Sequence, residues 1–262
     1  MTAKLMGVVN VTPDSFSDGG LYLDPAAAIA HGEELAAAGA AILDVGGEST
    51  RPGAERVGVE EELRRVGPVI EALAAGAAEV SVDTSKALVA EAALEAGAEI
   101  VNDVTALRGD PEMAALCAER GATVVLMHMR GDPRTMQDHP TYDDVVEEVR
   151  AFLAERLEAA VEAGIAEERI WLDPGIGFGK TAEHNFELLA RLPELAALGR
   201  PLVIGTSRKS FIGALDGSSA RERLGGTIAS SVLAAAAGAS VLRVHDVAEA
   251  AQALSLATAV LG

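Results

Sequence analysis

Short apolar runs alternate with amphipathic, helix-like segments from one end of the chain to the other. The runs are rich in Val, Ile and Leu, and they are bounded by Gly, Pro, Asp or Asn, which is typical of buried β-strands. Between the runs, apolar residues recur at spacings of three and four, which predicts helices with one buried face. The predicted strands cover residues 5–10, 41–45, 79–83, 99–102, 123–127, 170–172, 201–204 and 240–243.

Capping residues mark several predicted helix starts. Asp24–Pro25 combines an N-cap carboxylate with a proline in the first turn. Asp110–Pro111 repeats that pattern, and Thr84–Ser85 is expected to cap the helix after the third strand. The stretch 246–249 carries a capping pair that opens the last helix. Further helices are predicted over residues 63–73, 145–157, 185–192 and 221–237.

This alternation predicts the fold class. Eight strand–helix units in about 250 residues match a (β/α)8 TIM barrel, here a single domain over residues 1–262. An open, doubly wound α/β sheet is the alternative. Two features count against it: no GxGxxG motif opens the first helix, and no break in composition divides the chain.

Composition narrows the range of partners. The chain carries 40 acidic and 21 basic residues, for a net charge of −19, so it lacks the electrostatic footprint of a nucleic-acid or anionic-membrane binder. An anionic ligand would therefore need a local basic cluster. The single cysteine, Cys117, excludes an internal disulfide. No signal-peptide pattern is present, and the uncharged stretch 224–242 is diluted by Gly, Ser and Thr, so we expect a cytoplasmic protein.

Polar residues stand at or just beyond the C-terminal ends of several predicted strands. In a barrel of parallel strands those ends meet at one face, where such enzymes carry their sites. A shared site is therefore expected from residues that lie far apart in the sequence. They are Asn10, Asp83, Asn102, Asp173, Lys209, Arg243 and His245.

One subset of these residues fits a flat nitrogenous ring. Asp83, Asn102 and Asp173 present short acceptors, and a ring N–H beside an exocyclic amine would supply the donors that buried carboxylates require. Lys209 could reach a ring carbonyl or nitrogen. Two plainer interpretations remain open, namely that Asp83 caps the next helix and that Asn102 forms a turn.

A second subset fits an anion. Arg243 and His245 flank Val244 and would point the same way if the strand continues, while Thr50 and Arg51 follow the second strand. Surface salt bridges are the plainer interpretation. Asn10 could offer its amide oxygen to Mg²⁺, which takes few protein ligands when phosphates supply the others. No histidine or carboxylate set has zinc spacing.

Three glycine-containing loops surround this predicted mouth. In the stretch 173–180, Asp173 is followed by Gly175, Gly177 and Gly179, which permit either a close approach to a ligand or an ordinary tight turn. The polar loops 11–20 and 46–53 are expected to close over the site, or else to be ordinary surface loops. His128 and Arg130 follow the fifth strand and are assigned a supporting role.

With these residues identified, the chain resembles the dihydropteroate synthases, the pterin-binding family. Seven matching stretches run in order along nearly the whole chain, and those beginning at Asn10 and Asp173 are the most specific. They are 10–20, 44–53, 81–84, 102–103, 173–180, 205–213 and 243–246.

The resemblance implies a pterin-binding barrel that joins 6-hydroxymethyl-7,8-dihydropterin diphosphate to 4-aminobenzoate and releases diphosphate, in folate biosynthesis. It implies Mg²⁺ as cofactor, a homodimer with plausible faces on the late helices (221–237 and 246–261), and competition by sulfonamides. It further implies the following roles. Asp83, Asn102, Asp173 and Lys209 bind the pterin; Asn10, Thr50, Arg51, Arg243 and His245 bind the diphosphate, with Asn10 on the metal; Phe16, Arg51, Pro52, Phe178, Lys209 and Ser210 bind 4-aminobenzoate; and Asp18, Arg51 and Lys209 take part in catalysis.

Three other functions remain as alternatives. A corrinoid-linked methyltetrahydrofolate methyltransferase barrel would share the Asp83, Asn102 and Asp173 set but would not need Arg243 and His245. A non-catalytic pterin-binding paralogue is expected to lose residues such as Asn10, Arg51 or Lys209. A generic phosphate-binding barrel isomerase or aldolase would leave the stretches at Asn10 and Asp173 without explanation.

Overall fold

The computed structural model describes residues 3–12, 24–50, 54–131 and 135–261. All eight predicted strands are present; β3 and β5 have the expected bounds, and the other bounds differ by at most two residues. The seventh is the shortest and begins two residues later than predicted. The strands are β1 Lys4–Asn10, β2 Ile42–Gly46, β3 Glu79–Asp83, β4 Ile100–Asp103, β5 Thr123–Met127, β6 Ile170–Asp173, β7 Val203–Ile204 and β8 Val241–Val244.

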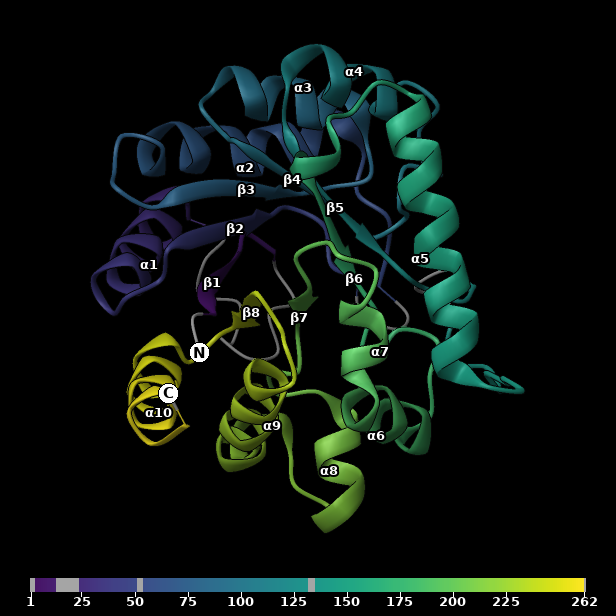
Figure 1. Ribbon diagram of the computed structural model, residues 1–262. Helices are drawn as coiled ribbons and strands as arrows, with labels where there is room; N and C mark the ends of the chain where they lie inside the picture. The colour runs from purple at the N-terminus through teal and green to yellow at the C-terminus, as the bar shows by residue number, and fades with distance from the viewer. Residues whose placement is uncertain (1–2, 13–23, 51–53, 132–134, 262) are drawn as a thin grey trace.

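The strands form one parallel sheet that closes on itself. Their order is β6-β5-β4-β3-β2-β1-β8-β7, and every pairing is parallel. The two ends of this order meet where Leu172 bridges Leu202, and the Leu172 N–H donates to the carbonyl of Pro201 at 2.9 Å. The sheet is therefore a barrel rather than an open doubly wound sheet, which confirms the predicted (β/α)8 fold (Figure 1).

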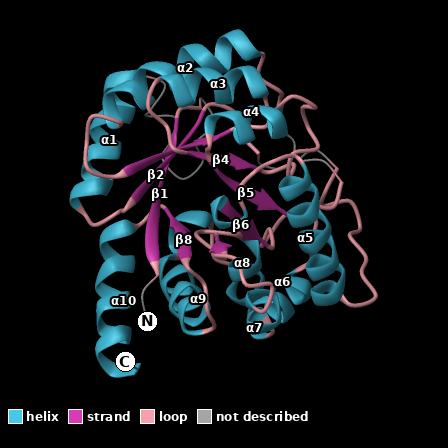
Figure 2. Ribbon diagram, turned by 45° about the horizontal axis from the view of Figure 1, so that its top comes forward, coloured by secondary structure: helices cyan, strands magenta, loops and turns pink. Residues whose placement is uncertain are grey.

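Helices surround the barrel on its outside (Figure 2). Within the described residues, no helix combines the length and the apolar content that crossing a bilayer requires. The α-helices are α1 Pro25–Ala37, α2 Val59–Leu73, α3 Ala87–Glu95, α4 Met113–Arg120, α5 Val145–Glu162, α6 Ala182–Ala190, α7 Leu192–Ala196, α8 Ser210–Asp216, α9 Leu224–Ala236 and α10 Val247–Leu261, with 3-10 turns η1 Glu167–Arg169 and η2 Ala220–Glu222.

The helix starts bear out some capping predictions and correct others. Asp24 accepts from the Ala26 N–H at 3.1 Å, as expected. Thr84–Ser85 is not the cap of α3, because the helix begins at Ala87 and its N–H donates to the Asp110 carboxylate at 2.9 Å. The start at Asp110–Pro111 was also placed too early, since α4 begins at Met113.

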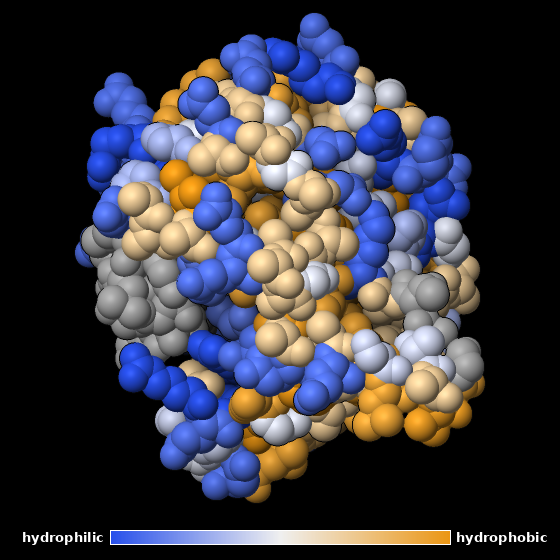
Figure 3. Space-filling model, turned by 90° about the vertical axis from the view of Figure 1, so that its left-hand side faces the viewer, coloured by the Kyte–Doolittle hydropathy of each residue, from blue (hydrophilic) through white to orange (hydrophobic). Residues whose placement is uncertain are grey.

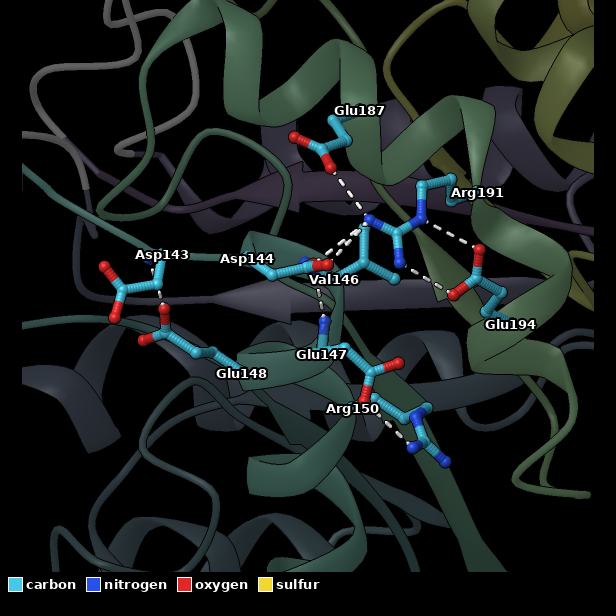
Figure 4. A network of polar contacts seen from close by, with 9 residues as sticks. All are labelled: Asp143, Asp144, Val146, Glu147, Glu148, Arg150, Glu187, Arg191 and Glu194. Carbon is cyan, nitrogen blue, oxygen red and sulfur yellow. Dashed lines mark hydrogen bonds and ion pairs between the residues drawn. The ribbon is translucent and has the colours of Figure 1, made fainter.

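The helix predicted after β6 also differs from the structure. The helix expected over 185–192 is two helices, α6 and α7, which meet at Arg191. The guanidinium of Arg191 binds Asp144 at the N-terminus of α5, Glu187 on α6 and Glu194 on α7, so one side chain joins three helices (Figure 4). Asp246 directly precedes α10, where the capping pair is predicted to open the helix, and its carboxylate binds Arg208 at 2.5 and 3.0 Å.

The strands divide the core into an outer layer and a barrel interior. Successive residues of a strand point to opposite faces. The outward residues, such as Val45, Val82 and Leu126, pack against the helices in one large apolar cluster. A smaller cluster fills the interior and consists of Met6, Ile42, Ile100, Val125, Val203 and Val241.

Candidate active site

The pairing register sets the polar ends of neighbouring strands at the same height. Asn10 pairs with Gly46, Gly46 with Asp83, and Asp83 with Asn102. Asp173 is the last residue of β6, which pairs with β5 in the same sense. Because the strands are parallel, these residues meet at the C-terminal face of the barrel.

A cavity of about 650 Å³ opens at this face. Asn102 and Asp173 are buried, with 6% and 8% of their surfaces exposed, and are not among the described residues that line it. Phe16, Asp18, Arg51 and Pro52 lie outside the described residues. The predicted site residues that line the cavity are Asn10, Thr50, Asp83, Phe178, Lys209, Ser210, Arg243 and His245.

A buried polar network joins two of the predicted ring-binding residues, Asp83 and Asn102, to Arg243. Its centre is Asp44 on β2, which is fully buried. One Asp44 oxygen accepts from the Ser81 hydroxyl at 2.6 Å, and the other accepts from Asn102 Nδ2 at 3.1 Å and Arg243 Nε at 2.6 Å. Arg243 Nη2 donates to Asp83 at 2.9 Å. The guanidinium therefore lies between two carboxylates.

The electrostatics of this network follow from its burial. Burial raises the pKa of Asp83 to about 7; the nearby Asp44 carboxylate adds to the rise, and the Arg243 guanidinium opposes it. Burial lowers the pKa of Arg243, but Asp44 and Asp83 outweigh that effect and bring it above its ordinary value. Arg243 therefore remains charged, while Asp83 can exchange a proton near neutral pH.

Asp173 at the end of β6 and Lys209 after β7 lie close enough for their charges to influence each other. Asp173 Oδ1 accepts from the Gly175 N–H at 2.6 Å. Burial raises the pKa of Asp173, while Lys209 and the Gly175 N–H oppose the rise. Burial lowers the pKa of Lys209 to about 8, against the attraction of Asp173. The Lys209 ammonium lies 4.6 Å from the centre of the Phe178 ring and donates to the carbonyl of Ile176.

His245 lies on the same cavity but outside the strand. β8 ends at Val244, so the condition under which Arg243 and His245 would point the same way, a strand that continues, is not met. Its Nδ1 lies 2.9 Å from the Ser207 hydroxyl, and its N–H donates to the same oxygen at 3.2 Å. The loop after β7 thus fixes the orientation of His245.

His128 and Arg130, the predicted supporting residues after β5, contact the loop after β6. His128 is buried, and burial together with the Lys180 ammonium lowers its pKa to about 2, so it is neutral. Its Nδ1 lies 2.9 Å from Lys180 Nζ. The Arg130 guanidinium stacks 4.5 Å from the centre of the Tyr142 ring and binds Glu148 at 3.2 Å.

Asp44 is the site residue that the sequence pattern did not single out, although it lies in one of the matching stretches. It sits inside the apolar run 41–45, which was interpreted only as a strand. A carboxylate within such a run is costly to bury without hydrogen-bonding partners. A carboxylate in this position therefore indicates that buried polar partners are present. Its partners Asn102 and Arg243 come from strands far along the chain, so their identity could not be predicted locally.

The residues at the mouth of the cavity are compatible with a Mg²⁺ ion that is bound mainly by the oxygens of a phosphorylated ligand. Asn10 contributes an amide oxygen to the cavity that Thr50 and His245 also line. The described residues contain no cluster of three His, Cys, Asp or Glu side chains that would hold a metal alone. Any magnesium here would therefore depend on oxygens from the ligand.

Comparison with known proteins gives a consistent result. The family described as pterin binding enzyme matches residues 6–245. The dihydropteroate synthase of Escherichia coli K12 is 50% identical over 258 residues, which are 98% of this chain and 91% of that protein.

Solved structures agree with the sequence relatives. Yersinia pestis dihydropteroate synthase in complex with a sulfonamide drug has a TM-score of 0.97 at 45% identity, covering 99% of this chain and 94% of that one. The Xanthomonas albilineans enzyme with 4-aminobenzoic acid has a TM-score of 0.93 at 53% identity, covering 100% of this chain and 94% of that one.

Proposed function

The chain belongs to the pterin-binding enzymes, among the dihydropteroate synthases, and we propose which of its residues perform the reaction of that class. This reaction transfers the pterin methylene group from diphosphate to the amine of 4-aminobenzoate, giving 7,8-dihydropteroate in folate biosynthesis. The observation that carries the residue assignment is the shared cavity, which Asp83 lines together with Lys209, Arg243 and His245. The Arg243 guanidinium there is bound by Asp83 and by the buried Asp44 behind it.

The pterin ring is assigned to the polar side chains at the C-terminal ends of β3, β4 and β6 and to Lys209. The carboxylates of Asp83 and Asp173 accept from ring N–H and amine groups, and Asn102 is held by Asp44 for the same purpose. Lys209 leaves the Ile176 carbonyl to donate to the ring. Each of these groups comes from a different strand or loop, so they can contact one ring only where the barrel brings the strand ends together.

The anionic tail is assigned to the groups around the mouth. Thr50, His245 and Arg243 line the cavity and bind the diphosphate. Asn10 fits as the single protein ligand of Mg²⁺, which when bound would neutralise charge on the departing diphosphate. Because the chain as a whole is negatively charged and repels anions, binding the diphosphate requires this local set of hydrogen-bond donors and positive charges.

The bond from the methylene carbon to the diphosphate oxygen breaks first in the mechanism we favour. Its electron pair leaves with the diphosphate, and the nearby carboxylates stabilise the methylene cation. The 4-aminobenzoate nitrogen then forms the new bond and loses a proton; its low basicity removes the need for a strong general base. Scrambling of the bridging oxygen during slow turnover is the measurement that checks this order, and its absence counts against it.

The second substrate is assigned to the outer part of the cavity. Phe178, Lys209 and Ser210 line it there, and the Phe178 face can stack on the aromatic ring. The solved relatives that hold 4-aminobenzoic acid and a sulfonamide drug favour a shared subsite for both molecules. Roles for Phe16, Asp18, Arg51 and Pro52 remain predictions.

Two further assignments concern the whole protein. A homodimer is proposed through the late helices, where Leu233 and Leu256 are each 68% exposed. The cytoplasm is the proposed compartment, because a chain with a single, buried cysteine gains nothing from an oxidising environment.

The direct test supplies the protein with 6-hydroxymethyl-7,8-dihydropterin diphosphate, 4-aminobenzoate and Mg²⁺. Formation of 7,8-dihydropteroate and diphosphate in equal amounts is expected, with inhibition by a sulfonamide that competes with 4-aminobenzoate. Methyl transfer from methyltetrahydrofolate to a corrinoid, without dihydropteroate formation, would favour the methyltransferase alternative. Ring binding without turnover would favour the non-catalytic one.

A further inference from the structure

The loop after β6 is held by side chains at every carbonyl from Gly175 to Gly179. Gly175, Gly177 and Gly179 all have positive φ, so no regular ladder can satisfy this backbone. Instead, each carbonyl accepts from a side chain. The donors are Lys180 at Gly175 and Phe178, Lys209 at Ile176, Gln137 at Gly177 and Tyr142 at Gly179.

Lys180 supplies two of these five contacts. Its Nζ lies 3.0 Å from the Gly175 and Phe178 carbonyls and 2.9 Å from His128 Nδ1, and the residue is only 3% exposed. Burial lowers its pKa well below the usual value. Both carbonyl contacts survive deprotonation, because a neutral amine still has two N–H donors and can accept from an Nδ1–H of His128.

The loop also presses on the backbone that follows β5. A Cβ at Gly175 would lie 1.9 Å from the His128 carbonyl oxygen, and one at Gly179 would lie 2.6 Å from that of Arg130. The loop therefore packs directly on residues 128–130, and Lys180 Nζ contacts both the loop carbonyls and His128 Nδ1. This packing sets where Phe178 stands, and Phe178 faces the cavity beside Lys209.

We propose that Lys180 is a positioning residue for the second substrate: by fastening the Gly175 and Phe178 carbonyls, it holds the Phe178 ring at the stacking distance for 4-aminobenzoate. Lys180 does not line the cavity among the described residues, so it acts through the loop. The role rests on the proposed function, whose failure would already show as an inactive wild-type protein.

The test is Lys180→Met, which keeps the apolar stem and removes the donors. We expect the KM for 4-aminobenzoate to rise about tenfold with kcat within about twofold, since a displaced stacking partner weakens binding of that substrate. Affinity for 6-hydroxymethyl-7,8-dihydropterin should fall by less than about threefold, because Asp83 and Asn102 lie on other strands. A small loss is expected because Asp173 and Lys209 contact the backbone of the same loop, at Gly175 and Ile176. Lys4→Met, which breaks the Lys4–Glu79 ion pair at the opposite end of the barrel, is the matched control and should change neither value.

A second variant decides the matter if Lys180→Met does not fold, as judged by fluorescence of the single tryptophan, Trp171. Tyr142→Phe removes only the hydroxyl that donates to the Gly179 carbonyl at 2.7 Å. It should raise the KM for 4-aminobenzoate about threefold, in the same direction, because it loosens the same loop. An unchanged KM in the folded variants, or an equal loss of pterin affinity, would overturn the proposal.

Discussion

A single buried carboxylate, that of Asp44, connects the two halves of the active site. It accepts from Asn102, which we assign to the pterin, and from Arg243, which we assign to the diphosphate. Since its acceptors are occupied by protein donors and it is fully buried, it orients these residues rather than touching the substrate. The geometry of both subsites therefore depends on one charge.

Asp44→Asn is expected to damage activity and stability together. The new amide would direct N–H groups at Arg243 or Asn102, leaving a buried guanidinium short of one acceptor, at a cost of about 3 kcal/mol in the free energy of unfolding. We expect kcat/KM for the pterin diphosphate to fall about 100-fold, measured at a temperature where the variant is folded.

Asp103→Asn is the control for that substitution. Asp103 is also fully buried, but it accepts from the Thr105 and Leu107 N–H groups and does not line the cavity among the described residues. It should lose stability while keeping kcat/KM nearly intact. Equal kinetic losses in both variants would show that Asp44 has only a general structural role.

The pH dependence of kcat/KM should report the titration of two groups of the free enzyme, Asp83 and Lys209. Asp83, with a pKa of about 7, accepts from the ring only as a carboxylate, so kcat/KM for the pterin diphosphate should fall as pH drops through 7. Lys209, with a pKa of about 8, donates best as an ammonium, so kcat/KM should fall as pH rises through 8. A steady-state profile that is flat between about pH 6 and 9 would contradict both assignments.

At the level of elements, the positions of the strands could be predicted from the sequence, whereas the helix starts could be predicted only in part. Val, Ile and Leu runs bounded by turn residues located all eight strands, and their polar C-terminal residues indicated the site face. The start of α3 at Ala87 differs from the predicted one because the carboxylate of Asp110, distant in sequence, satisfies the Ala87 N–H. Long-range partners of this kind leave no local pattern.

The loop after β6 explains why a glycine is needed at position 175. Its φ is +66°, and an added Cβ would meet the His128 carbonyl oxygen at 1.9 Å. Gly175→Ala should therefore lower the free energy of unfolding by roughly 3 kcal/mol or more, through both strain and a backbone clash. Denaturant unfolding measures this loss.

Gly217 provides the matched comparison for Gly175. It follows α8 with a φ of +77°, but a Cβ there would meet nothing within 4 Å. Gly217→Ala should cost only the strain of a left-handed residue, about 1 kcal/mol. If the two variants are destabilised equally, the close approach to His128 is not what requires Gly175.

At the scale of the whole molecule, apolar side chains stand exposed on the last helices. Leu233 on α9 and Leu256 and Val260 on α10 are 68–72% exposed, and α9 packs against α10. Figure 3 faces the side of the molecule where α1 and α10 lie, and it shows apolar side chains gathered from the bottom centre to the lower right. Such a surface favours the proposed homodimer.

Leu233→Glu tests that surface. A buried carboxylate in the interface should shift the protein from dimer to a 26.8 kDa monomer in sedimentation equilibrium. Leu88→Glu is the control, since Leu88 on α3 is 56% exposed and lies on a different part of the barrel. A wild-type protein that sediments as a monomer, or a Leu233→Glu variant that stays dimeric, contradicts this interface.

The central claim is that separate parallel strands bring acids and amides together to bind one pterin ring. Calorimetric titration of the pterin diphosphate into wild type and Asp173→Asn tests it most directly, because an asparagine Oδ1 can still accept from the Gly175 N–H and so preserves the loop. We predict that the variant keeps the wild-type circular dichroism and loses measurable binding. A folded Asp173→Asn variant that binds with normal affinity would contradict the account.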